Sequence, residues 1–228
     1  TGRVYDQIRM EVCYGKTNVK IASSHAGVTL GEDGATHQTM EDIALMRVLP
    51  DMVVINPCDW TQTKNATIAA AKYDGPVYLR FGRPKVADFM PDEPFEIGKA
   101  YVLNEGKDVS IFATGHMVWE ALQAAEALEA EGICAEIIDI ATIKPLDTKA
   151  VLASAIKTGA VVVAEEHNMA GGLGELIAGV LAATSPKPIE YVNGKDEFGQ
   201  SGTPSELLAA YGMDAAHIVE AGNNGILY

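Results

Sequence analysis

The stretch VSIFATGHMVWEALQAAEALEAEGICAEIIDI, residues 109–140, decides the fold class. It begins with an apolar run, turns at Thr114-Gly115, continues with a helical pattern over 118–131 and ends with a second apolar run over 134–140. Apolar runs that alternate with helices of ten or more residues are typical of parallel strands joined by crossover helices. The sequence therefore predicts an α/β fold around this unit.

The alternation of strands and helices continues in both directions from this unit. The expected strands lie at 18–23, 52–56, 76–80, 160–164 and 189–192. The expected helices cover 4–14, 38–49, 59–73, 148–157, 173–183 and a segment that starts at Pro204. Because strands and helices alternate in both halves of the chain, we predict two open, doubly wound α/β sandwiches with parallel sheets.

A proline-containing, acidic stretch at 84–94 separates the two predicted units. We place a partial first domain at residues 1–88, a linker at 89–98 and a complete second domain at 99–228. The chain begins at Thr1, without Met and already in a helical pattern. We therefore expect the first domain to be truncated at its N-terminus.

The charge of the chain is strongly acidic and unevenly distributed. The 228 residues include 17 basic and 31 acidic side chains, a formal net charge of −14, which argues against nucleic acid or an anionic membrane surface as a partner. Residues 1–90 carry ten basic and ten acidic side chains, and all five arginines lie among them. The first unit therefore contains the side chain best suited to bind phosphate.

The three cysteines, Cys13, Cys58 and Cys134, lie far apart and show no metal-ligand spacing. An odd number of cysteines without a signal peptide fits the reducing cytoplasm. No apolar run approaches the length of a membrane span. We therefore expect a cytoplasmic protein without a membrane partner.

The loop at 24–37 is the segment richest in chemically active side chains. It holds two histidines, two adjacent acids and three glycines between a predicted strand and a predicted helix. Ligands of open α/β sheets bind at the carboxyl ends of strands, where histidine can transfer protons and carboxylates can bind hydroxyl groups. The alternative is that the acids and Thr36 only cap and turn the chain. The spacing of His25 and His37 is not a metal-ligand signature, so no metal site is predicted.

Two arginines, Arg80 and Arg83, lie at the end of another predicted strand of the first unit. A flexible glycine stands between them, so the pair could hold a phosphate or a carboxylate through several donors. Surface ion pairs are an equal alternative on spacing alone.

Several of these segments together resemble one enzyme family. Ser23-Ser24-His25, followed by GEDGATHQ at 31–38, resembles the pyrimidine-domain loop of transketolases. The order of the other pieces agrees, namely 52–59, the arginine turn at 80–83, IKPLD at 143–147, EEH at 165–167 and FGQSG at 198–202. The resemblance covers essentially the whole chain and points to the C-terminal subunit of split, two-chain transketolases.

Two related classes share this architecture, namely deoxyxylulose-phosphate synthase and the β subunits of 2-oxoacid dehydrogenases. His25 favours transketolase over the synthase, in which another residue usually occupies this place of the loop. The unbroken GEDGATH motif at 31–37 argues against the oxoacid dehydrogenases. We therefore prefer transketolase and keep both relatives as alternatives.

The resemblance implies that the protein transfers a two-carbon ketol unit between sugar phosphates, with thiamine diphosphate and Mg²⁺ as cofactors. It implies that His25 and His37 are catalytic residues that bind substrate oxygens, and that His25 also lies beside the cofactor. It implies that Asp33 binds a hydroxyl group of the acceptor sugar and that Arg83 holds the substrate phosphate. Arg80 is a second, weaker candidate for the phosphate.

The resemblance also implies partners. The motif that binds the metal and the diphosphate belongs to an N-terminal subunit, and the glutamate that activates the cofactor is expected before residue 1. We expect a homodimer formed through the second domain, and no activity of this chain by itself. The alternative function is a non-catalytic module for dimerisation and assembly.

Overall fold

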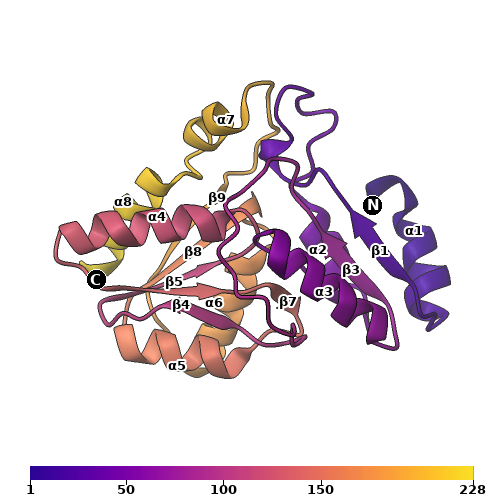
Figure 1. Ribbon diagram of the computed structural model, residues 1–228, viewed down its shortest axis with the longest axis horizontal. Coiled ribbons are helices and arrows are strands. Elements are labelled where there is room, and N and C mark those ends of the chain that lie inside the picture. Colours follow the sequence, from indigo (N-terminus) through magenta and orange to yellow (C-terminus); the bar gives the residue numbers. More distant parts are fainter. Residues whose placement is uncertain (228) are drawn as a thin grey trace.

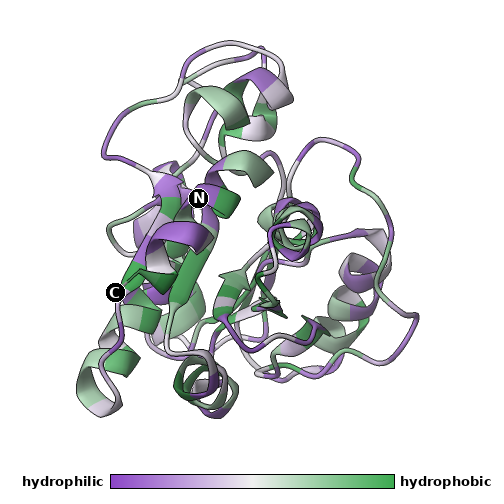
Figure 2. Ribbon diagram, turned by 90° about the vertical axis from the view of Figure 1, so that its left-hand side faces the viewer, coloured by the Kyte–Doolittle hydropathy of each residue, from purple (hydrophilic) through white to green (hydrophobic). Residues whose placement is uncertain are grey.

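The structure, a computed structural model, describes residues 1–227 and contains two α/β units that lie side by side (Figure 1). Between strands β3 and β4 the chain runs from Phe81 to Ala100 without regular structure. Hydrophobic residues concentrate in the strands, and many loops are polar (Figure 2). Among residues 1–227, no helix is both long and apolar enough to cross a membrane.

The first unit is built on a four-stranded sheet with the strand order β1-β3-β2-β7. Its strands are β1 (Lys20–Ser23), β2 (Val53–Ile55), β3 (Val77–Arg80) and β7 (Thr142–Lys144). Its helices are α1 (Tyr5–Gln7), which continues in a wider helical turn over Ile8–Tyr14, α2 (Asp42–Arg47) and α3 (Trp60–Lys72). The Asp59 carboxylate accepts a hydrogen bond from the Gln62 backbone N–H and thereby caps α3.

The second unit is built on a five-stranded sheet with the strand order β4-β6-β5-β8-β9. Its strands are β4 (Tyr101–Asn104), β5 (Val109–Ala113), β6 (Ala135–Asp139), β8 (Val161–Asn168) and β9 (Ile189–Gly194). Its helices are α4 (Met117–Ala130), α5 (Thr148–Thr158), α6 (Leu173–Thr184), α7 (Pro204–Ala210) and α8 (Ala215–Ile226).

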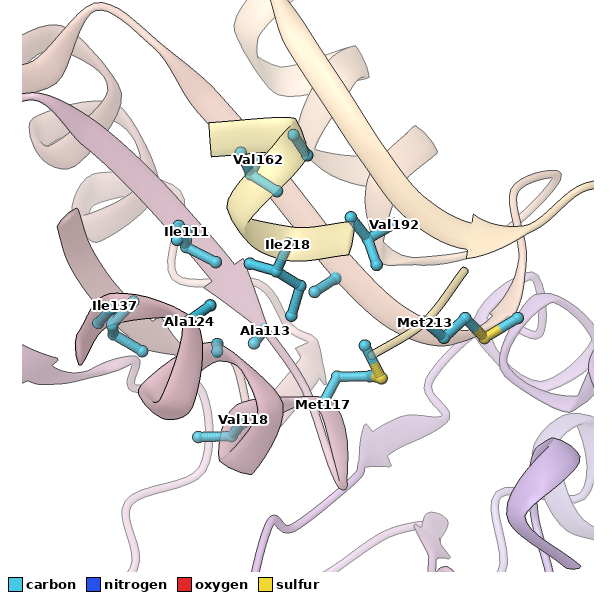
Figure 3. Packing of buried hydrophobic residues seen from close by; sticks show 14 of the residues in the cluster. Ile111, Ala113, Met117, Val118, Ala124, Ile137, Val162, Val192, Met213 and Ile218 are labelled. Carbon is cyan, nitrogen blue, oxygen red and sulfur yellow. The ribbon is translucent and has the colours of Figure 1, made fainter. Parts of the chain in front are cut away.

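The core of the second unit follows from the alternation of side chains along its strands. Ile111 and Val162 of the sheet pack in one cluster with Ile218 of α8 and Ala124 of α4 (Figure 3). Their strand neighbours, such as Phe112, face the other side and pack with residues of α5 and α6. Helices thus cover both faces of the sheet, which confirms the predicted doubly wound sandwich.

Two strands differ from the prediction of purely parallel sheets. β4 pairs antiparallel with β6, and β7 pairs antiparallel with β2 of the first sheet. β7 follows β6 in sequence but completes the sheet of the other unit, so the backbones of the two units share hydrogen bonds. A strand of three residues carries too short a pattern for its pairing partner to be read from the sequence.

A buried ion pair lies where the two units meet. The Arg80 guanidinium donates to Asp42 through Nε, at 2.8 Å, and through Nη2, at 3.2 Å, and Nη2 also donates to the Glu166 backbone carbonyl at 2.9 Å. The Tyr78 hydroxyl donates to the same Asp42 carboxylate at 2.7 Å. Burial alone would raise the pKa of Asp42, but the charge and hydrogen bonds of Arg80 outweigh it and hold that pKa below its usual value.

A second buried carboxylate, Asp139 at the end of β6, lies against α3 of the first unit. It accepts a hydrogen bond from Gln62 Nε2 at 2.5 Å, while its Oδ1 has no partner among the described residues. Burial raises the pKa of Asp139 to about 7. The folded state therefore favours the protonated form of this side chain.

We predict that Asp42→Asn lowers the free energy of unfolding by about 3–5 kcal/mol, because it leaves the Arg80 charge buried without a counter-charge. Denaturant titration of the variant and of the wild type measures the difference. The matched control is Asp92→Asn, which breaks the exposed Lys64–Asp92 pair and should cost less than about 1 kcal/mol. Equal losses in the two variants would contradict the central role of the buried pair.

We predict that Asp139→Asn stabilises the protein more at pH 8 than at pH 5. An aspartate has a pKa of about 3.9 in the unfolded chain, so the wild type loses stability as the pH rises from about 4 toward the raised folded pKa, about 7, and the asparagine does not. The gain should grow by roughly 2.5 kcal/mol between the two pH values. Unfolding curves at both pH values measure it, and a pH-independent difference would contradict the prediction.

Candidate functional site

The candidate site lies at the carboxyl end of the first sheet. β1 and β3 are parallel neighbours, and their last residues, Ser23 and Arg80, pair in the register. The loop after β1 and the turn after β3 therefore start side by side, and the Ala26 N–H donates to the Phe81 carbonyl at 3.1 Å. This edge of a parallel sheet is where ligands of open α/β folds bind.

The loop between β1 and α2 is closed by its own backbone. The Gly27 N–H donates to the Thr39 carbonyl at 2.8 Å, and a short helical turn, Val28–Leu30, follows. The His37 N–H donates to the Gly34 carbonyl at 3.0 Å. α2 consequently starts at Asp42 rather than at residue 38 as predicted, because the residues before it complete the loop. The loop lies beside α7 at the top of Figure 1.

The two predicted histidines are both exposed on this loop. His25 has a φ of +68°, a left-handed conformation that is strained for a residue with a side chain, and its Nδ1 lies 2.8 Å from Ser24 Oγ. His37 Nδ1 lies 2.9 Å from Thr36 Oγ1. Within the described residues neither ring has a hydrogen-bond partner at Nε2, so Nε2 is the atom that each ring can offer to a ligand.

Arg83 lies against the acidic part of the loop. Its Nη1 donates to the Leu30 carbonyl at 2.6 Å, and it lies 3.5 Å from Asp33 Oδ2 and 3.6 Å from Glu32 Oε2. The Arg83 side chain is 43% exposed, and both acids are exposed, so these ion pairs are weak and can open for a ligand. A cavity of about 220 Å³ is lined by Thr29, Leu30, Glu32, Arg83, Pro84 and Pro204.

The structure separates the two arginines that the sequence left together. Arg80 is 3% exposed, and its donors bind Asp42 and the Glu166 carbonyl. The prediction that Arg80 holds a substrate phosphate is therefore corrected, because a phosphate would have to displace a buried counter-charge to reach it. Arg83 remains the arginine that a solvent-borne anion can reach.

Glu166, a residue of the second unit to which the sequence motifs assign no individual role, contacts the loop. Its carboxylate is buried and accepts from the Thr29 N–H at 2.5 Å. The adjacent Glu165 is also buried, with its pKa raised by burial to about 7, and accepts from the N–H groups of Leu173 and Gly174. Two acids near the end of a buried strand are a signal that buried donors must lie nearby.

His167 is the third residue of this group. Burial lowers its pKa to about 4, so the ring is neutral. Its Nε2 accepts from the Ala44 N–H at 3.3 Å, and its Nδ1 lies 2.6 Å from the Asn168 carbonyl, which places the proton on Nδ1. The ring is held on both sides and serves packing between the two units.

Models of two transketolase domains match the chain. The pyrimidine binding domain of transketolase matches residues 1–88, and the C-terminal domain of transketolase matches residues 98–218. Within residues 1–227, no group of three or more histidine, cysteine, aspartate or glutamate side chains is arranged to hold a metal ion.

Three curated proteins show the relationship over most of the chain. The chain is 46% identical to a "Putative transketolase C-terminal section" of Methanocaldococcus jannaschii, over 96% of this chain and 70% of that protein. It is 44% identical to the "6-deoxy-6-sulfo-D-fructose transketolase subunit SqwH" of Clostridium sp., over 96% of this chain and 68% of that protein. It is 37% identical to one of the subunits of an apulose-4-phosphate transketolase of Phocaeicola vulgatus, over 93% of this chain and 68% of that protein.

A solved structure has the same fold. It is described as "Split gene transketolase, inactive beta4 tetramer", and it superposes with a TM-score of 0.93 and 49% identity over 99% of this chain and 73% of that chain. Sequence and structure therefore agree, and the chain belongs to the transketolase family.

Proposed function

We propose that the chain is part of the C-terminal subunit of a two-chain transketolase, which transfers a two-carbon ketol unit between sugar phosphates. The observation that carries this proposal is the loop at 24–37, which exposes His25 and His37 and places Asp33 beside Arg83 at the carboxyl edge of one sheet. The relatives described as a C-terminal section and as transketolase subunits support the two-chain form.

Thiamine diphosphate, when bound, supplies the carbon nucleophile of transketolase chemistry. The residues at the site fit the sugar side of such a reaction, because one loop carries two exposed imidazoles and an exposed carboxylate that lies beside Arg83. We place the ligands of Mg²⁺ and of the diphosphate on the N-terminal partner subunit, and we derive no step through them from this chain.

The two imidazoles suit substrate oxygens. We propose that His25 binds the hydroxyl and carbonyl oxygens of the transferred unit beside the cofactor, and that His37 binds oxygens closer to the phosphate. Each ring is anchored at Nδ1 by a neighbouring hydroxyl, which leaves Nε2 to donate or accept a proton. Asp33 would accept a hydrogen bond from a hydroxyl of the acceptor and so select its stereochemistry.

Arg83 gives the site a preference for anionic sugars. The sugars in two of the relatives' names, 6-deoxy-6-sulfo-D-fructose and apulose-4-phosphate, carry a sulfonate and a phosphate. A bound phosphate would replace the exposed carboxylates beside Arg83 and would supply binding energy remote from the reacting carbon.

The assembly is part of the same proposal. We expect contact with an N-terminal subunit, a homodimer through the second domain and a cytoplasmic location. A second candidate function, assembly without catalysis, is favoured for the isolated chain by the related split-gene chain that is described as an inactive tetramer. The two functions differ in whether catalysis appears when the partner subunit is added.

We predict that the subunit, expressed from its complete reading frame and mixed with its N-terminal partner, thiamine diphosphate and Mg²⁺, converts xylulose 5-phosphate and ribose 5-phosphate to products. Chromatography of the sugar phosphates measures the turnover. His25→Ala should lower kcat/KM at least ~10-fold, about 1.4 kcal/mol of transition-state stabilisation. Turnover by the 228-residue chain alone would contradict the need for the partner, and wild-type kinetics of His25→Ala would contradict the assigned site.

We predict that Arg83→Gln raises KM for phosphorylated donors at least ~10-fold and leaves an unphosphorylated donor such as hydroxypyruvate nearly unaffected, because one charge-assisted contact is lost. Steady-state kinetics with both donors in the two-subunit enzyme measure the difference. Arg9→Gln is the control, since Arg9 is an exposed arginine whose ion-pair partner is Asp6. Equal losses with both donors would show that Arg83 does not recognise the phosphate.

A further inference from the structure

The Glu166 carboxylate occupies a position inside the loop of the first unit. A side chain on Gly27 would begin 2.1 Å from Glu166 Oε1, so the carboxylate fills the space that any larger residue at this position would need. Gly27 also has a φ of +79° and a ψ of −168°, a conformation available only to glycine. The Glu166 carboxylate therefore fits into the loop only because residue 27 is a glycine.

Glu166 is itself held at its main chain. Its carbonyl accepts from Arg80 Nη2, and two residues further on the Asn168 N–H donates to the Met40 carbonyl at 2.8 Å. The end of β8 is thus hydrogen-bonded to the first unit at two points. One is Arg80 at the end of β3, and the other is Met40, two residues before α2. A carboxylate on such a support has little freedom to move away from its partner.

Two hydrogen bonds connect this carboxylate to the arginine of the proposed site. Glu166 Oε1 accepts from the Thr29 N–H at 2.5 Å, and the next residue, Leu30, accepts from Arg83 Nη1 through its carbonyl at 2.6 Å. Thr29 and Leu30 belong to one helical turn, which the Gly31 N–H closes by donating to the Val28 carbonyl at 3.0 Å. The position of the turn therefore determines where the Arg83 guanidinium is held.

We propose that Glu166 is a positioning residue through which the second domain sets the geometry of the anion-binding arginine. The carboxylate fixes the Val28–Leu30 turn, and the turn orients Arg83 toward the substrate anion. This inference rests on the proposed function only in taking Arg83 as the group that binds the anion of the substrate.

Three substitutions test whether the length or the charge of the Glu166 side chain matters for substrate binding. Glu166→Gln retains the length and an acceptor oxygen, whereas Glu166→Asp retains the charge but withdraws the carboxylate by one methylene group. The matched control is Glu165→Gln, because that carboxylate accepts from Leu173 and Gly174 of the second unit. Kinetics are measured in the assembled two-subunit enzyme with phosphorylated and unphosphorylated donors.

The expected result is that Glu166→Asp raises KM for the phosphorylated donor at least ~10-fold, with kcat and the unphosphorylated donor changed less than ~2-fold. Glu166→Gln should stay within ~3-fold of the wild type, and Glu165→Gln should not differ from it. Equal effects of Glu166→Asp on both donors, or an equal KM change in Glu165→Gln, would overturn the proposal.

Two further measurements do not depend on turnover. In the assembled protein, the Thr29 amide should exchange its hydrogen faster in Glu166→Asp than in the wild type, and inorganic phosphate, measured by calorimetry, should bind at least ~10-fold more weakly. If Glu166→Asp shows both changes but the wild type has no transketolase activity, the proposed function is refuted and the positioning role is not. Unchanged exchange and unchanged phosphate binding in Glu166→Asp would refute the positioning role itself.

Discussion

The arrangement of the two units depends on the hydrogen bonds that the buried Arg80 guanidinium donates. A charge removed from water is tolerated only when its donors are matched, and here the Asp42 carboxylate and the Glu166 carbonyl match them from two directions. Asp42 begins α2 of the first unit, and Glu166 lies near the end of β8 of the second. One side chain of β3 thus orients a helix and a strand that are distant in sequence.

The geometry of the candidate site depends on this contact. The loop that carries His25 and His37 leaves the sheet beside β3, and the second unit supports it through Glu166 and through Gln200, whose carbonyl accepts from Gln38 Nε2. The strongly acidic second domain, expected from the sequence to serve assembly, therefore also contributes to the wall of the site. If the proposed function holds, substrate recognition and domain packing depend on the same hydrogen bonds.

Much of the fold could be predicted because its signals are local. Asp59 and Asp147 accept from the first turns of their helices, Gly159 ends α5 in a left-handed conformation, and the apolar run at 109–113 forms β5. The predictions that failed concern elements whose partners lie far away in the chain. β7 has three residues, and its register depends on β2, while α2 starts late because the Thr39 and Met40 carbonyls accept from Gly27 and Asn168.

By itself, the sequence determined the alternation of strands and helices, the caps of several helices and the loop motif that indicates the family, since each depends on neighbouring residues. Only the tertiary structure decided between the two arginines. Arg80 is the last residue of β3 and lies buried between Asp42 and Glu166, whereas Arg83 stands three residues beyond the strand and remains exposed beside Asp33. The physical reason is that burial of a charge depends on partners that folding brings together. The residues next to each arginine in the sequence do not indicate those partners.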